Sequence, residues 1–180
     1  MRTIALIAAL ALSTPAWSAL NVGAVAPDFS TQGALAGKPF SFALRTALKK
    51  GPVVLYFYPK TFTQGCTIEA HQFAEAAGEF QKLHASLIGV SADTIEDITR
   101  FSATECRNKF PVAVATPMMI KAYDAALTMV GIGTGRSNRT SYVIAPDGKV
   151  IYTYSALAAE GHVHNTLDAL RKYWAAQKKG

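Results

Sequence analysis

Apolar residues in this chain follow two spacings, one typical of strands and one typical of helices. Short runs rich in β-branched and aromatic residues, bounded by Gly, Pro or polar residues, predict buried strands. These strands span residues 40–44, 53–58, 86–91, 110–115, 139–144 and 150–154. Apolar residues three or four positions apart predict helices over 64–84, 94–108, 118–127 and 160–176. Asp93 is a suitable N-cap for the second helix, with Glu96 three residues on.

The order of these elements predicts the fold class. Strands and helices alternate until a hairpin, joined by the turn sequence Pro146-Asp147-Gly148-Lys149, and a last helix close the chain. This order indicates an α/β fold with helices on both faces of a mixed sheet. Residues 131–138 are too glycine-rich for a helix or a strand, so we expect a mobile connection there. A strand rather than a helix follows them, which excludes a phosphate-binding loop.

The first nineteen residues are predicted to be a cleaved signal peptide rather than part of the fold. Arg2 supplies a positive charge, residues 4–12 are apolar, and small residues favour cleavage after Ser18. The apolar run is short for a membrane span, although an uncleaved anchor is the alternative. We therefore expect one domain over residues 20–180, in the periplasm or secreted, where an oxidising environment allows two cysteines to pair.

Charge indicates neither nucleic-acid binding nor stable membrane association. The formal net charge is +6, which is modest for this length. Lys172, Lys178 and Lys179 are spread around the predicted last helix, and Lys49-Lys50 precede a turn. Neither group interleaves with aromatic residues as a nucleic-acid surface would. We interpret both groups as solvated faces.

Cys66 is the first candidate for chemistry. It follows the predicted strand 53–58 after a short loop and lies where the helical spacing begins. We therefore expect it at a helix N-terminus, at the carboxyl end of a central strand. The helix dipole and free N–H groups favour an anion there, so a thiol is pushed toward the reactive thiolate. The alternative is an inert buried cysteine, a common state of free cysteines.

The residues around Cys66 resemble a known family. Pro59, Thr63 and Cys66 match the Pro-x-x-x-Thr-x-x-Cys signature of the peroxiredoxins. Tyr58-Pro59-Lys60 and Gly65-Cys66-Thr67-Ile68-Glu69-Ala70 are similar to the bacterioferritin-comigratory, or Q-type, branch, and Ala26-Pro27-Asp28-Phe29 resembles its amino-terminal motif. The resemblance thus covers nearly the whole chain after the leader. It implies a thioredoxin-like fold, with helices on both faces of a mixed central β-sheet.

The resemblance also implies the activity. A peroxiredoxin is a thiol-dependent peroxidase that reduces hydrogen peroxide and organic hydroperoxides through a cysteine sulfenic acid, without a cofactor. Its expected partners are the hydroperoxide substrate and a thioredoxin-like or other dithiol reductant, and we expect a monomer. Cys66 is then the nucleophile, and the resemblance assigns to Thr63 a hydroxyl presented at the sulfur. Pro59 shields the site, and Gly65 lets backbone N–H groups approach the substrate.

A cation beside the sulfur must come from another segment. Arg139 opens a stretch that resembles the family's Arg-x-x-Phe-hydrophobic-Ile segment, whose arginine faces the active cysteine. Arg136 is the rival, but we favour Arg139 because a strand positions a cation better than a loop. Glu69 follows Cys66 by three residues and is a candidate to orient the arginine; the alternative is an ordinary surface glutamate.

The second cysteine, Cys106, is the candidate resolving residue. Many Q-type members carry a second cysteine five residues after the first, where this chain has His71. Some members use a cysteine in the next helix, so the resemblance implies an intramolecular Cys66–Cys106 disulfide. The alternative is that Cys106 is structural and an external thiol resolves Cys66.

Other functions find less support in the sequence. A thiol–disulfide oxidoreductase or redox carrier on the same fold is the main alternative, but it requires Cys-x-x-Cys, and Thr63 takes the place of the first cysteine. A non-enzymatic binding module would need no reactive Cys66. His162 and His164 suggest a metal at an exposed helix start, yet no third ligand has suitable spacing, so we predict no metal site.

Overall fold

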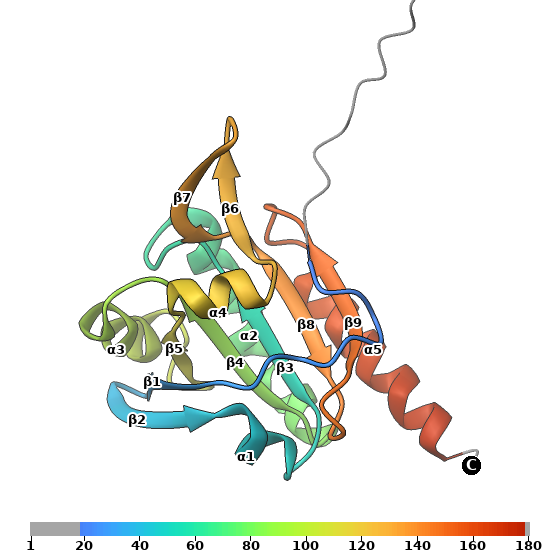
Figure 1. Cartoon of the computed structure of the whole chain (residues 1–180). Coiled ribbons are helices and arrows are strands. Elements are labelled where there is room, and N and C mark those ends of the chain that lie inside the picture. The colour runs from blue at the N-terminus through green and yellow to red at the C-terminus, as the bar shows by residue number, and fades with distance from the viewer. Residues whose placement is uncertain (1–18, 179–180) are drawn as a thin grey trace, which may run out of the picture.

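The structure is a computed structural model that describes residues 19–178 (Figure 1). The predicted leader and its preferred cleavage site at Ser18 lie outside the described residues. Over the range that is described, none of the helices is both long enough and apolar enough to cross a membrane. The elements are β1 (Ser30–Leu35), β2 (Lys38–Ala43), α1 (Leu44–Leu48), β3 (Val53–Phe57), α2 (Gln64–Lys82), β4 (Ser86–Ser91), α3 (Ile95–Thr104), β5 (Val112–Val114), α4 (Pro117–Ala122), β6 (Ala126–Met129), β7 (Ile132–Ser137), β8 (Thr140–Ile144), β9 (Val150–Ser155) and α5 (His162–Gln177).

A seven-stranded mixed sheet forms the centre of the molecule. Its strand order is β2-β1-β5-β4-β3-β8-β9 (Figure 1). Strands β3, β4 and β5 run parallel to one another, whereas β8 pairs antiparallel with β3 and β9 antiparallel with β8. This arrangement confirms the predicted α/β fold with a mixed central sheet.

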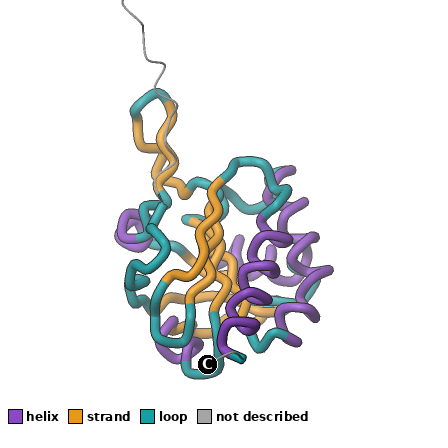
Figure 2. Tube along the Cα trace, turned by 90° about the vertical axis from the view of Figure 1, so that its right-hand side faces the viewer, coloured by secondary structure: helices purple, strands orange, loops and turns teal. Residues whose placement is uncertain are grey.

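The sheet separates two apolar cores because the side chains of its central strand point alternately to opposite faces. Val53, Leu55 and Phe57 of β3 belong to one core, with residues of α1 and α4. Val54 and Tyr56 belong to the other, with residues of α2, α3 and α5. In Figure 2 the strands lie between helices on either side. Burial on both faces explains why β3 reads as a continuous apolar run.

The structure contradicts the prediction for residues 131–138. They were expected to form neither a helix nor a strand, but residues Ile132–Ser137 form β7, which pairs with β6 in a two-stranded hairpin that projects from the body (Figure 2). The predicted helix over 118–127 accordingly ends at Ala122. Gly131 and Gly135 take positive φ angles, and Thr134 Oγ1 donates to the Leu127 carbonyl at 2.9 Å. Backbone pairing thus stabilises a hairpin whose side chains give no alternating apolar signal.

The start and end of α3 also differ from the prediction. Thr94 rather than Asp93 is the N-cap, and its hydroxyl accepts from the Asp97 amide at 3.3 Å. The helix ends at Thr104, so Cys106 lies in the turn that follows rather than in the helix. Strand β1 and helix α1 were not predicted, because β1 contains few apolar residues and α1 is only five residues long.

Candidate active site

Cys66 is the third residue of α2, beyond the carboxyl end of β3. Thr63 is the N-cap, and the first amide to bond back into the helix is that of Thr67, which donates to the Thr63 carbonyl at 2.9 Å. The amides before Thr67 therefore lie outside the helical hydrogen-bond ladder. The Cys66 side chain is only 2% exposed. The structure thus places the thiol where the sequence predicted it, in a buried anion-favouring position.

The loop between β3 and α2 is held by hydrogen bonds from two other segments of the chain. The Thr61 amide donates to Asp93 Oδ2 at 2.7 Å, and the Ser91 hydroxyl donates to the same oxygen at 2.9 Å. The Ser137 hydroxyl donates to the Tyr58 carbonyl at 2.8 Å. Asp93 follows β4, the parallel neighbour of β3, so it fixes this loop instead of capping a helix.

Two other predicted residues lie in the same loop. Pro59 follows β3 and is partly buried, and the Thr63 hydroxyl donates to the Lys60 carbonyl at 3.0 Å. Phe62 lies between them with a positive φ of 60°, which turns the chain into the helix. The loop therefore reaches α2 through a tight, hydrogen-bonded turn.

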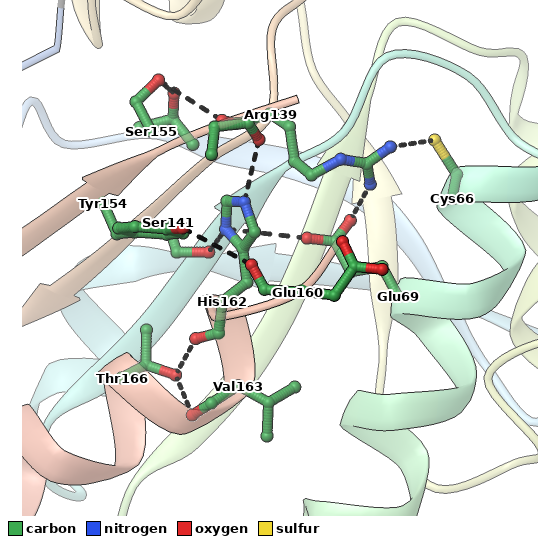
Figure 3. Close-up of polar contacts among 12 residues, drawn as sticks. Cys66, Glu69, Arg139, Ser141, Tyr154, Ser155, Glu160, His162, Val163 and Thr166 are labelled. Carbon is green, nitrogen blue, oxygen red and sulfur yellow. Dashed lines mark hydrogen bonds and ion pairs between the residues drawn. The ribbon is translucent and has the colours of Figure 1, made fainter. Parts of the chain in front are cut away.

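Arg139 reaches Cys66 because β8 pairs antiparallel with β3. In this register Thr140 is opposite Phe57, so the residue before Thr140 lies beside the loop that follows β3. Arg139 Nη2 donates to Cys66 Sγ at 3.4 Å (Figure 3). Its Nε donates to the Leu157 carbonyl at 2.8 Å. The side chain is almost fully buried. Arg136, the rival candidate, lies on the projecting strand β7.

The need for a glycine at position 65 is explained by the nearby Arg139 side chain rather than by the backbone dihedral angles of Gly65. A Cβ atom at Gly65 would lie 3.1 Å from Arg139 Nη2. That distance is shorter than an ordinary van der Waals contact, so a side chain here would displace the guanidinium. Gly65 therefore leaves room for the Arg139 guanidinium, in addition to its predicted role of letting backbone N–H groups approach the substrate.

Glu69 lies one helical turn after Cys66 and is wholly buried. The surface alternative is therefore wrong, because Glu69 Oε2 accepts a hydrogen bond from Arg139 Nη1 (Figure 3). Burial raises the pKa of Glu69 to about 8, although the charge and hydrogen bond of Arg139 oppose this rise. Burial tends to lower the pKa of Arg139, but Glu69 and Cys66 raise it, so the arginine remains a cation.

His162 belongs to the same buried group, which the sequence analysis missed. It is the first residue of α5 and is fully buried, so the expected exposed position is wrong for this residue. Its Nδ1 lies 2.8 Å from Ser141 Oγ and 3.7 Å from Glu69 Oε1, and its Nε2 lies 3.0 Å from the Ala156 carbonyl. Burial lowers its pKa to about 4.

A glycine allows this histidine to turn inward. Gly161 has a φ of 90°, and a Cβ there would lie 2.9 Å from the Tyr154 hydroxyl. His164, by contrast, is exposed and lies 3.1 Å from Asp168. Over residues 19–178 no three histidine, cysteine or acidic side chains gather as metal ligands would. A glycine directly before a histidine at a helix start was the only signal for His162 in the sequence.

Cys106 is fully buried on the same face of the sheet as Cys66. Both cysteines are free thiols, and burial raises the pKa of Cys106. Burial also raises the pKa of Tyr56 and of Tyr58, and the nearby Cys106 and Cys66 thiols add to this rise. The two cysteines therefore lie near the same pair of tyrosines, although no bond joins them.

The turn that carries Cys106 is attached to α2. His71 Nε2 lies 2.9 Å from Glu105 Oε2, and Arg107 Nη1 lies 3.2 Å from Glu75 Oε1. Arg107 also has a positive φ of 49°, as does Asn108 with 58°. Left-handed conformations are unfavourable for residues with a Cβ, so this turn stores backbone strain.

One mainly apolar hollow lies away from these residues. It has a volume of about 540 Å³ and lies between β2, α1 and the carboxyl-terminal part of α2. Its lining is mainly apolar, including Phe40, Phe80 and Phe110. The buried arginine and cysteine, rather than this hollow, mark the site of chemistry.

Comparisons with known proteins agree with this geometry. The model of the AhpC/TSA family matches residues 22–153. A putative peroxiredoxin bcp from Helicobacter pylori J99 is 30% identical over 153 residues, 84% of this chain and 98% of that protein. The peroxiredoxin Bcp of Escherichia coli K12 is 28% identical over 167 residues, 86% of this chain and 97% of its own.

Solved structures agree as well. Peroxidoxin BcpB from Mycobacterium tuberculosis superposes with a TM-score of 0.74 at 29% identity, over 84% of this chain and 96% of that one. The bacterioferritin comigratory protein of Xanthomonas campestris, studied for alkyl peroxide reduction, gives a TM-score of 0.69 at 29% identity, over 79% and 90% of the two chains.

Proposed function

This chain belongs to the AhpC/TSA family, in the Bcp or Q-type branch of the peroxiredoxins, and we propose from this premise how its residues divide the work of a thiol-dependent peroxidase. The single observation that carries the proposal is the contact between Arg139 and the Cys66 sulfur, at a buried helix N-terminus. Cys66 is the peroxidatic nucleophile and Arg139 is the cation that stabilises negative charge beside it.

In the first step, the Cys66 thiolate attacks the terminal oxygen of a hydroperoxide. A sulfur–oxygen bond forms, the O–O bond breaks, and the cysteine becomes a sulfenic acid while the peroxide is reduced. The departing alkoxide or hydroxide then takes one proton and leaves as an alcohol or water. Arg139 and the free amides of the first turn of α2 stabilise the charge that moves along the O–O axis.

The rim of the site suits organic hydroperoxides as well as hydrogen peroxide. Phe62 in the loop before α2 is 39% exposed, and Leu157, whose carbonyl holds Arg139, is 48% exposed. These apolar side chains can contact the alkyl part of a substrate. The relative from Xanthomonas campestris was studied for alkyl peroxide reduction, which supports the same substrate class here.

In the second step, the Cys106 thiolate attacks the Cys66 sulfenic sulfur. A sulfur–sulfur bond forms, the sulfur–oxygen bond breaks, and the departing hydroxide takes one proton and leaves as water. Both thiols lie near the same buried tyrosines, which supports this pairing. Both are also buried, so the first turn of α2 must open before they meet. A thioredoxin-like or other dithiol then reduces the disulfide and regenerates both thiols.

Mass spectrometry after one equivalent of peroxide tests this assignment. The reduced protein should gain an internal disulfide, which corresponds to the loss of two hydrogens. The variant Cys106→Ser should gain one oxygen at Cys66, and Cys66→Ser should not react. A Cys66→Ser variant that still consumed peroxide would overturn the peroxidase assignment to Cys66. An oxidoreductase without peroxidase activity would leave every variant unmodified.

We also propose that the chain is exported after removal of its leader, and that the mature protein is a monomer. The short apolar segment and the small residues near Ser18 support the first point. Amino-terminal sequencing of protein from a periplasmic fraction should begin at Ala19, and an intact Met1 in that fraction would contradict cleavage. Light scattering coupled to size exclusion should give the mass of one chain.

A further inference from the structure

Two buried side chains near Arg139, Glu69 and His162, face each other with polar atoms that both act as acceptors. His162 Nε2 lies 3.0 Å from the Ala156 carbonyl, which can only accept, so Nε2 carries a proton. In a neutral ring Nδ1 is therefore an acceptor. The Ser141 hydroxyl, 2.8 Å away, satisfies it by donating a hydrogen bond. That hydrogen bond uses the single lone pair of Nδ1, so the ring has no second acceptor and no proton to offer on this edge.

Glu69 presents an unpaired oxygen to the same nitrogen. Its Oε1 lies 3.7 Å from His162 Nδ1 and has no hydrogen-bond partner among the described residues. Neither side chain is exposed. Two acceptors that face each other repel, and a buried carboxylate oxygen without a hydrogen-bond partner is unfavourable. Figure 3 shows this pair directly behind the guanidinium of Arg139.

One proton resolves the mismatch. A proton on Glu69 Oε1 would compete with the Ser141 hydroxyl for the Nδ1 lone pair. A second proton on the ring would instead point at the carboxylate, and the Ser141 hydroxyl would turn to accept. We propose that Glu69 and His162 hold one proton between them, and that this proton decides how much of the positive charge of Arg139 acts on Cys66. His162 is thereby a positioning residue for the peroxidase reaction, an inference that rests on the proposed function of Cys66 and Arg139.

The electrostatic consequence follows from the contacts of Arg139. When the pair holds its proton, Glu69 is neutral, and the guanidinium charge is available to the sulfur thiolate and to the leaving oxygen. When the proton is lost, the carboxylate neutralises the guanidinium at close contact. The site then stabilises negative charge on the substrate less well, and the rate of peroxide reduction falls.

The neighbours of the pair allow a range of pH to be named. The ionisable groups that face it come from four elements: Cys66 of α2, Arg139 beside β8, Tyr56 of β3 and Tyr154 of β9. Burial raises the pKa of Tyr56, so this hydroxyl stays neutral. Burial also raises the pKa of Glu69 to about 8 and lowers that of His162 to about 4. The proton therefore resides on the carboxyl at neutral pH and leaves as pH rises through about 8.

The test is the pH profile of kcat/KM for hydrogen peroxide, measured by stopped flow on the full mature chain. Wild type should lose rate as pH rises through about 8. In Glu69→Gln this decline should vanish, because a carboxamide has no such proton to lose. In His162→Gln the new amide can donate to Oε1 and stabilise the carboxylate. The decline should then move to lower pH by about one unit.

Ser141→Ala gives a shift of opposite sign. Without the hydroxyl, His162 Nδ1 has only the Glu69 proton to accept, so the decline should move to higher pH. The matched control is His164→Gln, which changes the exposed histidine two residues on and should leave the profile unchanged. A structural role for His162 would lower stability in the variants without moving the profile in these opposite directions.

Infrared spectroscopy separates this inference from the proposed function. Wild type minus Glu69→Gln should show a protonated carboxyl band at pH 7 that disappears by pH 9.5, whether or not the protein turns over peroxide. Absence of that band at pH 7 would overturn the inference. A wild-type rate that stays flat through this range, or a decline that persists unchanged in Glu69→Gln, would overturn it too.

Discussion

Replacing Arg139 with lysine is the sharpest test of the site. The guanidinium bonds three acceptors at once: the Cys66 sulfur at 3.4 Å, the Leu157 carbonyl at 2.8 Å and the Glu69 carboxyl. A lysine keeps the charge but has one nitrogen and no planar fork. Because Glu69 is fully buried, its oxygens attract the ammonium most strongly, and the contact with the sulfur is the one that is lost.

The size of the effect follows from that lost contact. A hydrogen bond to a charged group contributes about 1.5–3 kcal/mol. Loss of one such bond in the transition state corresponds to a decrease in kcat/KM of about tenfold to about 150-fold. The decrease should appear in the second-order rate of peroxide reduction, measured by stopped flow before any reductant is added. Circular dichroism should show an intact fold, since the lysine keeps a buried polar contact with Glu69.

Arg136→Lys is the matched control, since Arg136 is three residues away on the projecting strand β7. It should leave the rate near that of wild type. A larger loss in Arg136→Lys than in Arg139→Lys, or an unchanged rate in Arg139→Lys, would refute the reasoning.

Three further outcomes are expected. Cys106→Ser should consume one equivalent of peroxide and then need a small external thiol to turn over, and unchanged turnover with a protein dithiol would exclude it as the resolving residue. The reduced protein should melt at the same temperature as the oxidised one or higher, because opening the first turn of α2 offsets the roughly 4 kcal/mol that a loop of this length would contribute; a clearly higher melting temperature after oxidation would indicate a static structural bridge. Gly65→Ala should lower kcat/KM about tenfold by displacing Arg139. The control Gly78→Ala lies in the same helix, where an added Cβ meets nothing within 4 Å, so it should keep activity and raise the free energy of unfolding by about 0.5–1 kcal/mol. Equal rates for the two variants would contradict the explanation given for the glycine at position 65.

The central part of the fold was predictable because its signals are local. Strand β3 is a continuous apolar run, β4 is another, and the motif from Pro59 to Cys66 is contiguous. Its position after a central strand and at the start of a helix follows from those neighbours alone. Arg139 was found by resemblance, because it begins a recognisable stretch of sequence, although the structure places it just before β8 rather than in a strand.

The residues that the sequence did not reveal act through tertiary contacts. We predicted Asp93 to be a helix cap, because nothing in its own segment shows that β4 lies beside β3. That pairing brings Asp93 to the Thr61 amide. We expected His162 to be exposed, because its burial depends on the packing of α5 over β8 and β9, which its own segment does not show. The β6–β7 hairpin was missed because glycines at positive φ hide its strand character.

The attachment of the Cys106 turn to α2 has a consequence for how the protein fails. If Cys106 resolves the sulfenic acid, that acid must wait until the α2 turn and the turn held by His71–Glu105 and Glu75–Arg107 have both opened. During this wait a second peroxide molecule can oxidise the sulfur to the sulfinic acid, which a dithiol does not reverse. The fraction of enzyme that stays active therefore depends on the rate of local unfolding relative to the rate at which a second peroxide oxidises the sulfenic acid. The dose at which the protein inactivates measures the opening time of two turns, and loosening the ion pairs should raise the dose that it tolerates.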